Sequence, residues 1–318
     1  HAAPPSRPPT AAQEWRANWP LVLAAMAGLS FGSVPAATLG LFMTPLEQDF
    51  GWSRAMVSAG MMVFAAIALP FTPFAGALVD RWGARACAIP GLVLSGLAFA
   101  GFSAMTGAGW QWWLIWVLYA FASLLIRSMV WNSAVSNAFS ASRGLAIAIV
   151  LAGLALPQVI GPPLANWLIE AIGWRMTYAV IGIGWAGTAL LLVTFFFHAR
   201  RPEQALPKAA ERSPPAPPPA TGGLTLGEAF RDPAILRIAI AIFLSTLMGA
   251  AIAIHIVPLL EWAGVSRAAA AGLAAALGIG SIAGKVLTGA LVDRFTGGWL
   301  PFAVFSLPAL GYFLIWQG

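Results

Sequence analysis

The chain has 318 residues, of which 59% are hydrophobic and only 9% are charged, and its mean hydropathy is +0.81. Soluble proteins carry roughly 25% charged residues, so this composition excludes a soluble domain. The net charge of +6 comes from basic residues scattered between apolar segments, a pattern that sets orientation in a membrane and does not form a nucleic-acid-binding patch. Cys87 is the single cysteine, which excludes a disulfide framework and a thiolate metal cluster.

Nine apolar segments are each long enough to cross a bilayer as a helix, which takes ~20 residues. They comprise residues 20–43, 55–78, 86–105, 112–136, 145–169, 176–197, 235–258, 269–291 and 298–316. If the N-terminus is inside the cell, only Arg54, Arg175 and Arg267 face outward among the basic residues of the tails and loops. Cytoplasmic loops carry the excess of lysine and arginine, so the sequence predicts a cytoplasmic N-terminus.

These segments divide the chain into four regions. Residues 1–18 are predicted to be a disordered tail, 19–198 a six-helix transmembrane half, 199–233 a cytoplasmic linker, and 234–318 a partial second half with three transmembrane helices. The linker contains RRPEQALPKAAERSPPAPPPATGG, which is too rich in proline and charge to build a core. The chain does not begin with methionine, and we interpret it as a fragment.

One charged hexamer occurs twice, each time at the end of an apolar segment. GALVDR at residues 76–81 recurs at residues 289–294, an offset of 213 residues. At the same offset, GWSRA (51–55) matches GVSRA (264–268), and the Pro-Leu pair at 45–46 recurs at 258–259. The offset crosses six predicted spans, so both copies point the same way through the membrane. Parallel repeats of this kind are typical of transporters.

The aspartate of the hexamer needs a partner. Asp80 is predicted at the C-terminal end of a helix, where the helix dipole disfavours an anion. Arg81, Arg85 or the N-terminus of a neighbouring helix could supply the compensating charge. An ordinary positively charged cytoplasmic loop would explain the two arginines, but it would not explain why the hexamer is duplicated.

The repeated segment resembles a loop motif of the major facilitator superfamily, Gly-x-Leu-x-Asp-Arg-x-Gly-x-Arg. The first copy matches it at Gly76, Leu78, Asp80, Arg81, Gly83 and Arg85, and the second at Gly289, Leu291, Asp293 and Arg294. Thr296 stands where the second copy would carry glycine. Four further segments are similar to the monocarboxylate and oxalate/formate branch: LGLFMTPLEQDFGWSRAMVS (39–58), SRGLAIAIVLAG (142–153), GWRMTYAVIG (173–182) and HIVPLLEWAGVSRAAAA (255–271).

The resemblance implies an all-α membrane protein with the major facilitator fold, which normally has twelve helices. The chain would then hold the six-helix N-terminal half and the first three helices of the second half, with its C-terminal part missing. The resemblance also implies a cytoplasmic latch that holds one state of alternating access. Its residues would be Gly76, Asp80, Arg81, Gly83, Arg85, Gly289, Asp293 and Arg294.

Two cations lie inside predicted spans. Arg127 falls near the middle of the fourth span and Lys285 in the cytoplasmic half of the eighth. A charge at the centre of a bilayer costs about 2.5–3.5 kcal/mol on insertion scales, so both are candidates for substrate binding. Structural explanations remain open: Arg127 could bind backbone carbonyls or water, and Lys285 could extend to the cytoplasmic interface. All eleven acidic residues fall in tails, loops or span ends, and this imbalance favours an anionic substrate.

Aligned through the repeated hexamer, Lys285 occupies the position at which carboxylate transporters of this branch have a substrate-contacting arginine. Lysine offers a point charge in place of a bidentate fork. Ser281 replaces the aspartate that animal monocarboxylate transporters carry four residues earlier, so their proton-linked scheme does not transfer directly. His255, near the outer end of the seventh span, is a candidate for proton coupling, or simply a solvated interfacial side chain.

The sequence therefore predicts a secondary transporter of small organic anions, mono- or short dicarboxylates, working by alternating access. A drug exporter of the same superfamily is an alternative, although Gly161-Pro162 lacks the paired glycines of the drug-antiporter motif. A non-transporting sensor with this fold also stays open. An enzyme is not expected, because no metal-ligand set or nucleophile with a base is visible in the spans. We expect a monomer in the bacterial inner membrane, without cofactor, metal or nucleic acid.

Overall fold

The computed structural model describes residues 10–197, 231–265 and 267–294, together with residues 306, 307, 311 and 313. The regular structure of these residues is entirely helical. The chain divides into two compact units, one of residues 1–200 with 277–296, and the other of residues 201–276 with 297–318. The first unit contains a helical bundle and the C-terminal part of a later helix, and it holds most of the candidate residues.

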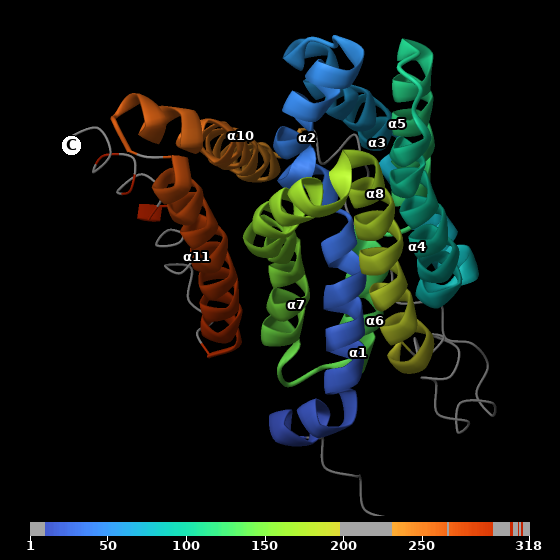
Figure 1. Ribbon diagram of the computed structural model, residues 1–318. Helices are drawn as coiled ribbons and strands as arrows, with labels where there is room; N and C mark the ends of the chain where they lie inside the picture. Colours follow the sequence, from blue (N-terminus) through green and yellow to red (C-terminus); the bar gives the residue numbers. More distant parts are fainter. Residues whose placement is uncertain are drawn as a thin grey trace, which may run out of the picture. The chain divides into compact units, whose positions relative to one another are not determined.

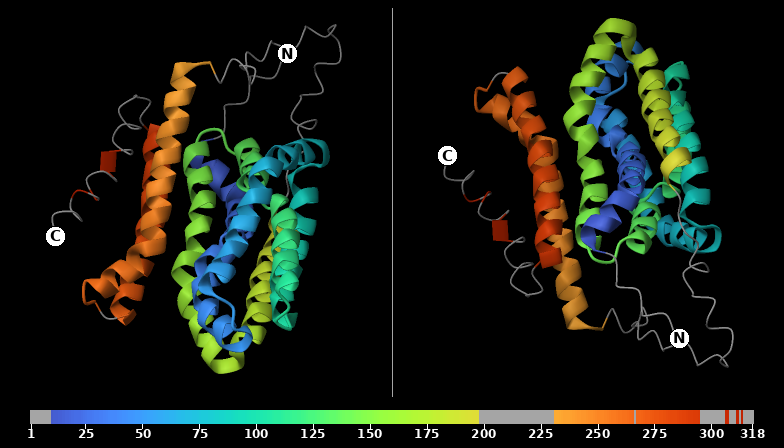
Figure 2. Two further views of the ribbon diagram at one scale, coloured as in Figure 1. Left: turned by 90° about the horizontal axis from the view of Figure 1, so that it is seen from above. Right: turned by 90° about the horizontal axis from the view of Figure 1, so that it is seen from below.

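The bundle comprises eight α-helices, and Figures 1 and 2 show how they pack together. They are α1 (Ala11–Phe31), α2 (Val34–Phe50), α3 (Arg54–Trp82), α4 (Ala84–Gly101), α5 (Gly109–Leu124), α6 (Ser128–Ala138), α7 (Arg143–Ala152) and α8 (Leu156–Phe196). Two short 3-10 helices, η1 (Phe102–Ala104) and η2 (Gly153–Ala155), extend α4 and link α7 to α8. The helices group into the first six predicted spans, because α1–α2, α5–α6 and α7–α8 are each nearly continuous and α8 divides at Gly173 into a fifth and a sixth span.

Glycines in the left-handed region turn the chain between spans. Gly51 ends α2 with φ 67°, and Gly83 separates α3 from α4 with φ 87°. Gly173 has φ 77° inside α8, so this 41-residue element is two helices joined at a sharp turn. Residues other than glycine rarely adopt positive φ angles, because their Cβ atom clashes with the backbone, and this explains why glycine occupies each turn.

Two spans of the bundle are interrupted within their apolar stretch. α1 gives way to α2 at Gly32–Ser33, and α5 gives way to α6 at residues 125–127. The Ser33 hydroxyl donates to the carbonyl oxygens of Ser30 (3.1 Å) and Leu154 (2.8 Å), so the first interruption is tied to η2. Broken helices are tolerated at membrane depth only where protein or a water-filled cavity resatisfies the backbone.

Aromatic side chains fill the centre of the bundle. Phe99 packs against the rings of Phe102, Tyr119 and Tyr178, with centroids 5.2–6.2 Å apart, and Phe42 stacks on Tyr178 at 3.8 Å. Close helix contacts use small residues, because a Cβ on Gly96 or Gly182 would overlap the facing helix. Aromatic rings and close contacts at glycines thus pack the bundle α1–α8 tightly.

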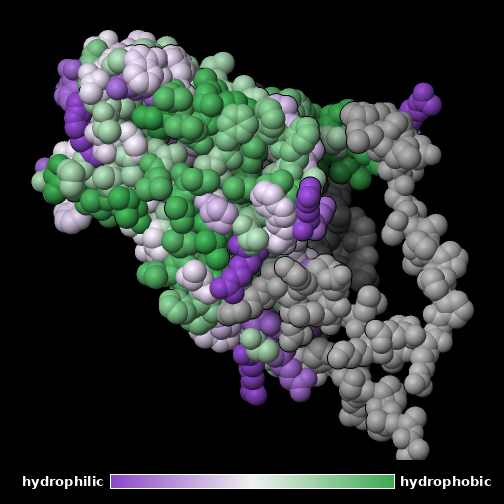
Figure 3. Space-filling view, turned by 90° about the vertical axis from the view of Figure 1, so that its right-hand side faces the viewer, coloured by the Kyte–Doolittle hydropathy of each residue, from purple (hydrophilic) through white to green (hydrophobic). Residues whose placement is uncertain are grey.

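The outer surface of the bundle is apolar. Figure 3 shows a broad hydrophobic area with hydrophilic residues gathered toward its two ends. Exposed side chains from α3, α4, α5 and α8 contribute to the apolar exterior of the bundle: Leu69, Phe74, Leu94, Leu97, Leu114, Leu118, Leu191 and Phe195. Five helical stretches in the described residues are long and apolar enough to cross a membrane, and the last, Arg143–Phe196, contains the turn at Gly173. Such a surface fits lipid and not water.

Two long helices follow the linker, α10 (Pro233–Trp262) and α11 (Arg267–Arg294). They cover the seventh and eighth predicted spans. Most of the predicted linker (199–233) and of the ninth span (298–316) lies outside the described residues. The predicted tail is described only from Thr10, and α1 begins at Ala11 within it. The Gln13 side chain accepts a hydrogen bond from the Thr10 backbone N–H (3.0 Å), and this bond stabilises the N-terminus of α1.

Candidate functional site

Arg127 stands at the interruption of the fourth span. It is the N-cap residue of α6, with extended backbone angles (φ −66°, ψ 158°), and no side-chain hydrogen bond caps the first turn of α6. The first N–H groups of a helix carry the positive end of its dipole. The break therefore brings a cation and a helix N-terminus together within an apolar segment.

The guanidinium of Arg127 lies over the ring of Phe64 and near Tyr119. Its Cζ lies 5.1 Å from the centroid of Phe64, and its charge interacts with the nearby Tyr119 hydroxyl. Arg127 Nε is buried, and within the described residues it has no hydrogen-bond partner. Both recorded ion pairs there involve other residues, so no carboxylate neutralises this cation. The geometry leaves Arg127 available to an anion.

Lys285 lies on the face of α11 that packs against the bundle. A Cβ on Gly278 would overlap Val159 of α8, and a Cβ on Gly289 would overlap Ala148 of α7. Lys285 follows Gly278 by seven residues and precedes Gly289 by four, and these spacings place all three on one side of a helix. The Lys285 side chain is half-buried, and it forms no recorded ion pair within the described residues. A direct contact between Lys285 and Arg127 is not recorded there either.

Asp293, from the second hexamer, binds the N-terminus of α7. Its Oδ1 accepts a hydrogen bond from the Gly144 N–H (2.9 Å), and its Oδ2 accepts one from the Leu145 N–H (2.7 Å). A carboxylate is favourable at a helix N-terminus because it meets free N–H groups and the positive end of the dipole. The partner of Asp293 is thus a helix N-terminus, a kind of partner that the sequence predicts for Asp80.

The glycine of the same hexamer allows this contact. Gly289 and Asp293 are four residues apart and share one face of α11, opposite Gly144 and Ala148 on α7. A Cβ on Gly289 would overlap the Ala148 Cβ and lie 2.9 Å from the Gly144 oxygen, and a Cβ on Gly144 would overlap the Asp293 carboxylate. The spacing Gly-x-x-x-Asp therefore combines a close helix approach with a capping carboxylate.

The first hexamer has different surroundings. Asp80 and Arg81 are exposed, and no hydrogen bond or ion pair to Asp80 is recorded in the described part of the chain. Arg85, predicted as one possible partner, instead donates from Nη2 to the Thr194 carbonyl oxygen (2.7 Å). A Cβ on Gly76 would meet only the flexible end of Met129, at 3.5 Å. The two copies of one sequence thus differ in what they contact.

Glu14, on the first turn of α1, lies within the predicted tail (1–18) and is not among the predicted site residues. It is buried, with 4% of its surface exposed, and its carboxylate accepts backbone hydrogen bonds from Ser140, Ala141 and Ser142 at 2.9–3.3 Å. Burial raises the pKa of this carboxyl, but the hydrogen bonds from Ser140, Ala141 and Ser142 together outweigh it and lower the pKa from 4.5 to about 2. Two carboxylates, Glu14 and Asp293, therefore converge on the start of α7. No local signal marks Glu14, because its partners lie about 126 residues away.

The sequence profile of the Major Facilitator Superfamily matches residues 19–317. The chain belongs to the Major Facilitator Superfamily. This family consists of membrane transporters and not enzymes, and it accounts for the all-α fold and the apolar exterior of the bundle. The chain is therefore an integral membrane protein.

Two curated relatives are similar to the chain over most of its length. Human monocarboxylate transporter 11 is 29% identical over 316 residues, which cover 94% of this chain and 61% of the relative. Mouse monocarboxylate transporter 11 is 26% identical over 304 residues, which cover 89% of this chain and 60% of the relative. The chain thus spans about three fifths of the length of these relatives, and its similarity to them agrees with the monocarboxylate branch that the motifs indicated.

Two of the branch-like segments contact each other near the C-terminal end of α2. The Trp174 indole donates to Asp49 Oδ2 (2.8 Å), and the Arg175 guanidinium lies 4.0 Å from the same oxygen. Arg175 also stacks over Trp174, with its Cζ 4.2 Å from the ring centroid. The segments 39–58 and 173–182 therefore form one structural connection between α2 and α8.

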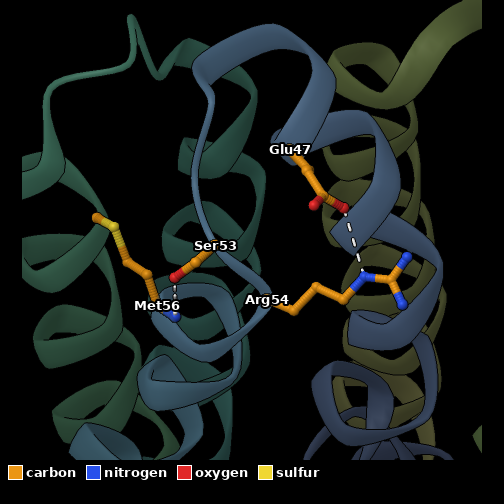
Figure 4. A network of polar contacts seen from close by, with 4 residues as sticks. All are labelled: Glu47, Ser53, Arg54 and Met56. Atoms are coloured by element: carbon orange, nitrogen blue, oxygen red, sulfur yellow. Dashed lines mark hydrogen bonds and ion pairs between the residues drawn. The ribbon is translucent and has the colours of Figure 1, made fainter.

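The turn that links α2 to α3 is held by its own polar side chains. Figure 4 shows the Ser53 hydroxyl accepting a hydrogen bond from the Met56 N–H (3.2 Å), and Arg54 reaching Glu47 Oε2 (3.4 Å). Ser53 is thus the N-cap of α3. The Arg54–Glu47 pair is largely exposed, so its energetic contribution is small.

The remaining candidates lie elsewhere. His255 is in α10, and its side chain lies outside the described residues. A search of the described residues for groups of three or more histidine, cysteine and carboxylate side chains that could hold a metal finds none. Gly161 is buried in α8, against Thr38 and Ala37 of α2, which gives it a packing role.

Proposed function

We propose that the protein is a secondary active transporter of small organic anions, with carboxylates as the substrate class. The observation that carries this proposal is the half-buried Arg127. Its Nε is unpaired within the described residues, and Arg127 occupies the N-cap position of a half-helix, α6. Broken helices of transporters use such termini to bind anionic groups of substrates. The names of the two relatives support a monocarboxylate in particular.

Lys285 is proposed as the second cation of the site. It comes from the second half of the repeat, and it faces the bundle and not lipid, since the glycines on either side of it pack against α7 and α8. A cation from each half would allow both halves to bind one anion, so that substrate binding is coupled to their relative movement.

The Gly289–Asp293 contact is proposed as a latch of alternating access. Asp293 holds α11 against α7 through two hydrogen bonds to backbone N–H groups, and these must break if the helices separate at this end. Arg294 is proposed to belong to this latch, and the motif residues of the first copy (Gly76, Asp80, Arg81, Gly83 and Arg85) are proposed to form the equivalent one. His255 is proposed for proton coupling.

The side of the membrane on which the N-terminus lies, and the kind of membrane that holds the protein, are proposals. The bias of basic residues supports a cytoplasmic N-terminus. The matched relatives are human and mouse proteins and give no support to a bacterial inner membrane, so that location stays a prediction. We also propose that the protein acts as a monomer.

The test is uptake of a labelled monocarboxylate by the protein reconstituted in vesicles. Arg127→Gln and Lys285→Gln should each raise the apparent KM about tenfold or more, because a hydrogen bond to a charged group contributes about 1.5–3 kcal/mol. Arg16→Gln removes an exposed cation outside the site and should leave uptake unchanged. Unchanged uptake by both site variants in well-folded protein would refute the carboxylate assignment.

A further inference from the structure

A cavity lies beside Arg127, at the interruption between α1 and α2. Its volume is about 140 Å³, and its lining includes Ser33, Pro35, Met61, Phe64, Trp116 and Tyr119. The wall is mainly apolar, formed by aliphatic and aromatic side chains of α2, α3 and α5. An engineered protein cavity of about 150 Å³ holds benzene, so this space suits a group the size of a phenyl ring.

The cavity and the cation share two side chains. The Phe64 ring lines the cavity and also lies 5.1 Å from the Arg127 Cζ. Tyr119 lines the cavity, packs on Phe64 with centroids 5.7 Å apart, and interacts electrostatically with Arg127. An anion held by Arg127 would therefore have its remaining atoms next to the cavity.

Two polar groups of the cavity wall lack partners. The Tyr119 hydroxyl and the Trp116 Nε1 are buried, each in a residue only 1% exposed, and neither has a hydrogen-bond partner within the described residues. Buried donors without partners are costly, and an acceptor oxygen on a ligand would satisfy them. Tyr119 is the better placed of the two, because it lines the cavity and interacts with Arg127, whereas Trp116 Nε1 packs against Gly60 of α3.

We infer that this cavity is a subsite for the side chain of the substrate, and that the protein prefers monocarboxylates with a ring-sized apolar group and an oxygen next to the carboxylate. This inference rests on the proposed carboxylate function. The carboxylate binds Arg127, the 2-oxo or 2-hydroxy oxygen accepts from Tyr119, and the apolar group occupies the space between Pro35, Met61 and Trp116. A short dicarboxylate fits poorly, because its second charge would enter an apolar wall.

Competition against uptake of labelled pyruvate tests the apolar subsite and the hydrogen bond from Tyr119 separately. Phenylpyruvate, which adds a ring to pyruvate, should compete at least tenfold better than unlabelled pyruvate, since burying a ring contributes a factor of this order. Phenylpyruvate should also exceed 3-phenylpropionate, which has the same skeleton without the 2-oxo group. The Tyr119→Phe variant should lose the preference for phenylpyruvate over 3-phenylpropionate but keep the preference for phenylpyruvate over pyruvate.

Ala36 also lines the cavity, from the exposed face of α2, and it allows the space to be filled. Ala36→Phe should reduce the preference for phenylpyruvate over pyruvate about tenfold. Ala66→Phe, at an exposed position of α3 outside the cavity, is the matched control and should keep the wild-type preference. A preference that Ala36→Phe leaves intact, or wild-type competition by phenylpyruvate no stronger than by pyruvate, would overturn the inference while leaving carboxylate transport standing. Absence of any pyruvate uptake or binding by the wild type would instead refute the proposed function.

Discussion

The two GALVDR hexamers have identical sequences and different surroundings. Asp293 accepts hydrogen bonds from the first turn of α7, whereas no partner of Asp80 is recorded among the described residues. Gly289 is pressed against α7, while Gly76 meets only the end of the Met129 side chain. The hexamer therefore encodes a helix face that is ready for a close contact, with glycine for the approach and aspartate for the cap. Whether the contact forms depends on the helix opposite.

The largest difference between the copies is expected from their glycines. Gly289→Ala would place a Cβ against Ala148 and the Gly144 backbone, neither of which can move easily, and should cost about 3 kcal/mol where α11 meets α7. Gly76→Ala meets a flexible methionine and should cost less than 1 kcal/mol. Crosslinking of engineered cysteine pairs between α7 and α11 would measure how far Gly289→Ala weakens the contact of these helices. Thermal unfolding in detergent would compare the stabilities of the Gly289→Ala and Gly76→Ala variants. Equal effects would show that the copies are not used differently.

The next effect concerns Glu14, which orders the loop before α7 and so prepares the helix terminus that Asp293 binds. Glu14→Gln should cost about 2 kcal/mol, because hydrogen bonds to a buried charged acceptor are weakened. The folded pKa of about 2 lies below the ordinary value of 4.5, so the stabilisation is complete above pH 4.5 and is lost as the pH falls toward 2. The melting temperature of the wild type should therefore approach that of the variant between these pH values. A gap that stays constant from pH 7 to pH 3 would contradict the role of the charge.

The smallest effect is expected from the aspartates themselves, because both are exposed. Asp293→Asn should weaken the contact with α7 by about 1 kcal/mol, the usual contribution of a carboxylate at a helix N-terminus. The protein should insert normally, transport more slowly and lose protection of the Gly144 and Leu145 amides in hydrogen exchange. Asp80→Asn should leave these two amides protected. Loss of their protection in both variants would mean that the two copies act on one structural element.

Much of this architecture follows from the sequence. A run of apolar residues that long must cross a bilayer as a helix, since backbone groups find no water there. The described helices therefore fall on the first eight predicted spans. Arg127 and Lys285 stand out because charge inside such a segment is costly. The periodicity of the repeat also placed Gly289 and Asp293 on one helix face, since residues four apart are neighbours on any helix.

The tertiary structure decided what these features contact. Glu14 lies in a stretch that the sequence predicts as a tail, and its hydrogen bonds with residues 140–142 cannot be seen in any local pattern. The cavity beside Arg127 combines side chains from α2, α3 and α5, which are distant in sequence and meet only when the bundle packs. The identical hexamers likewise differ because Asp293 faces a helix N-terminus. Local sequence determines which face a helix presents, and the packing of distant segments determines what that face meets.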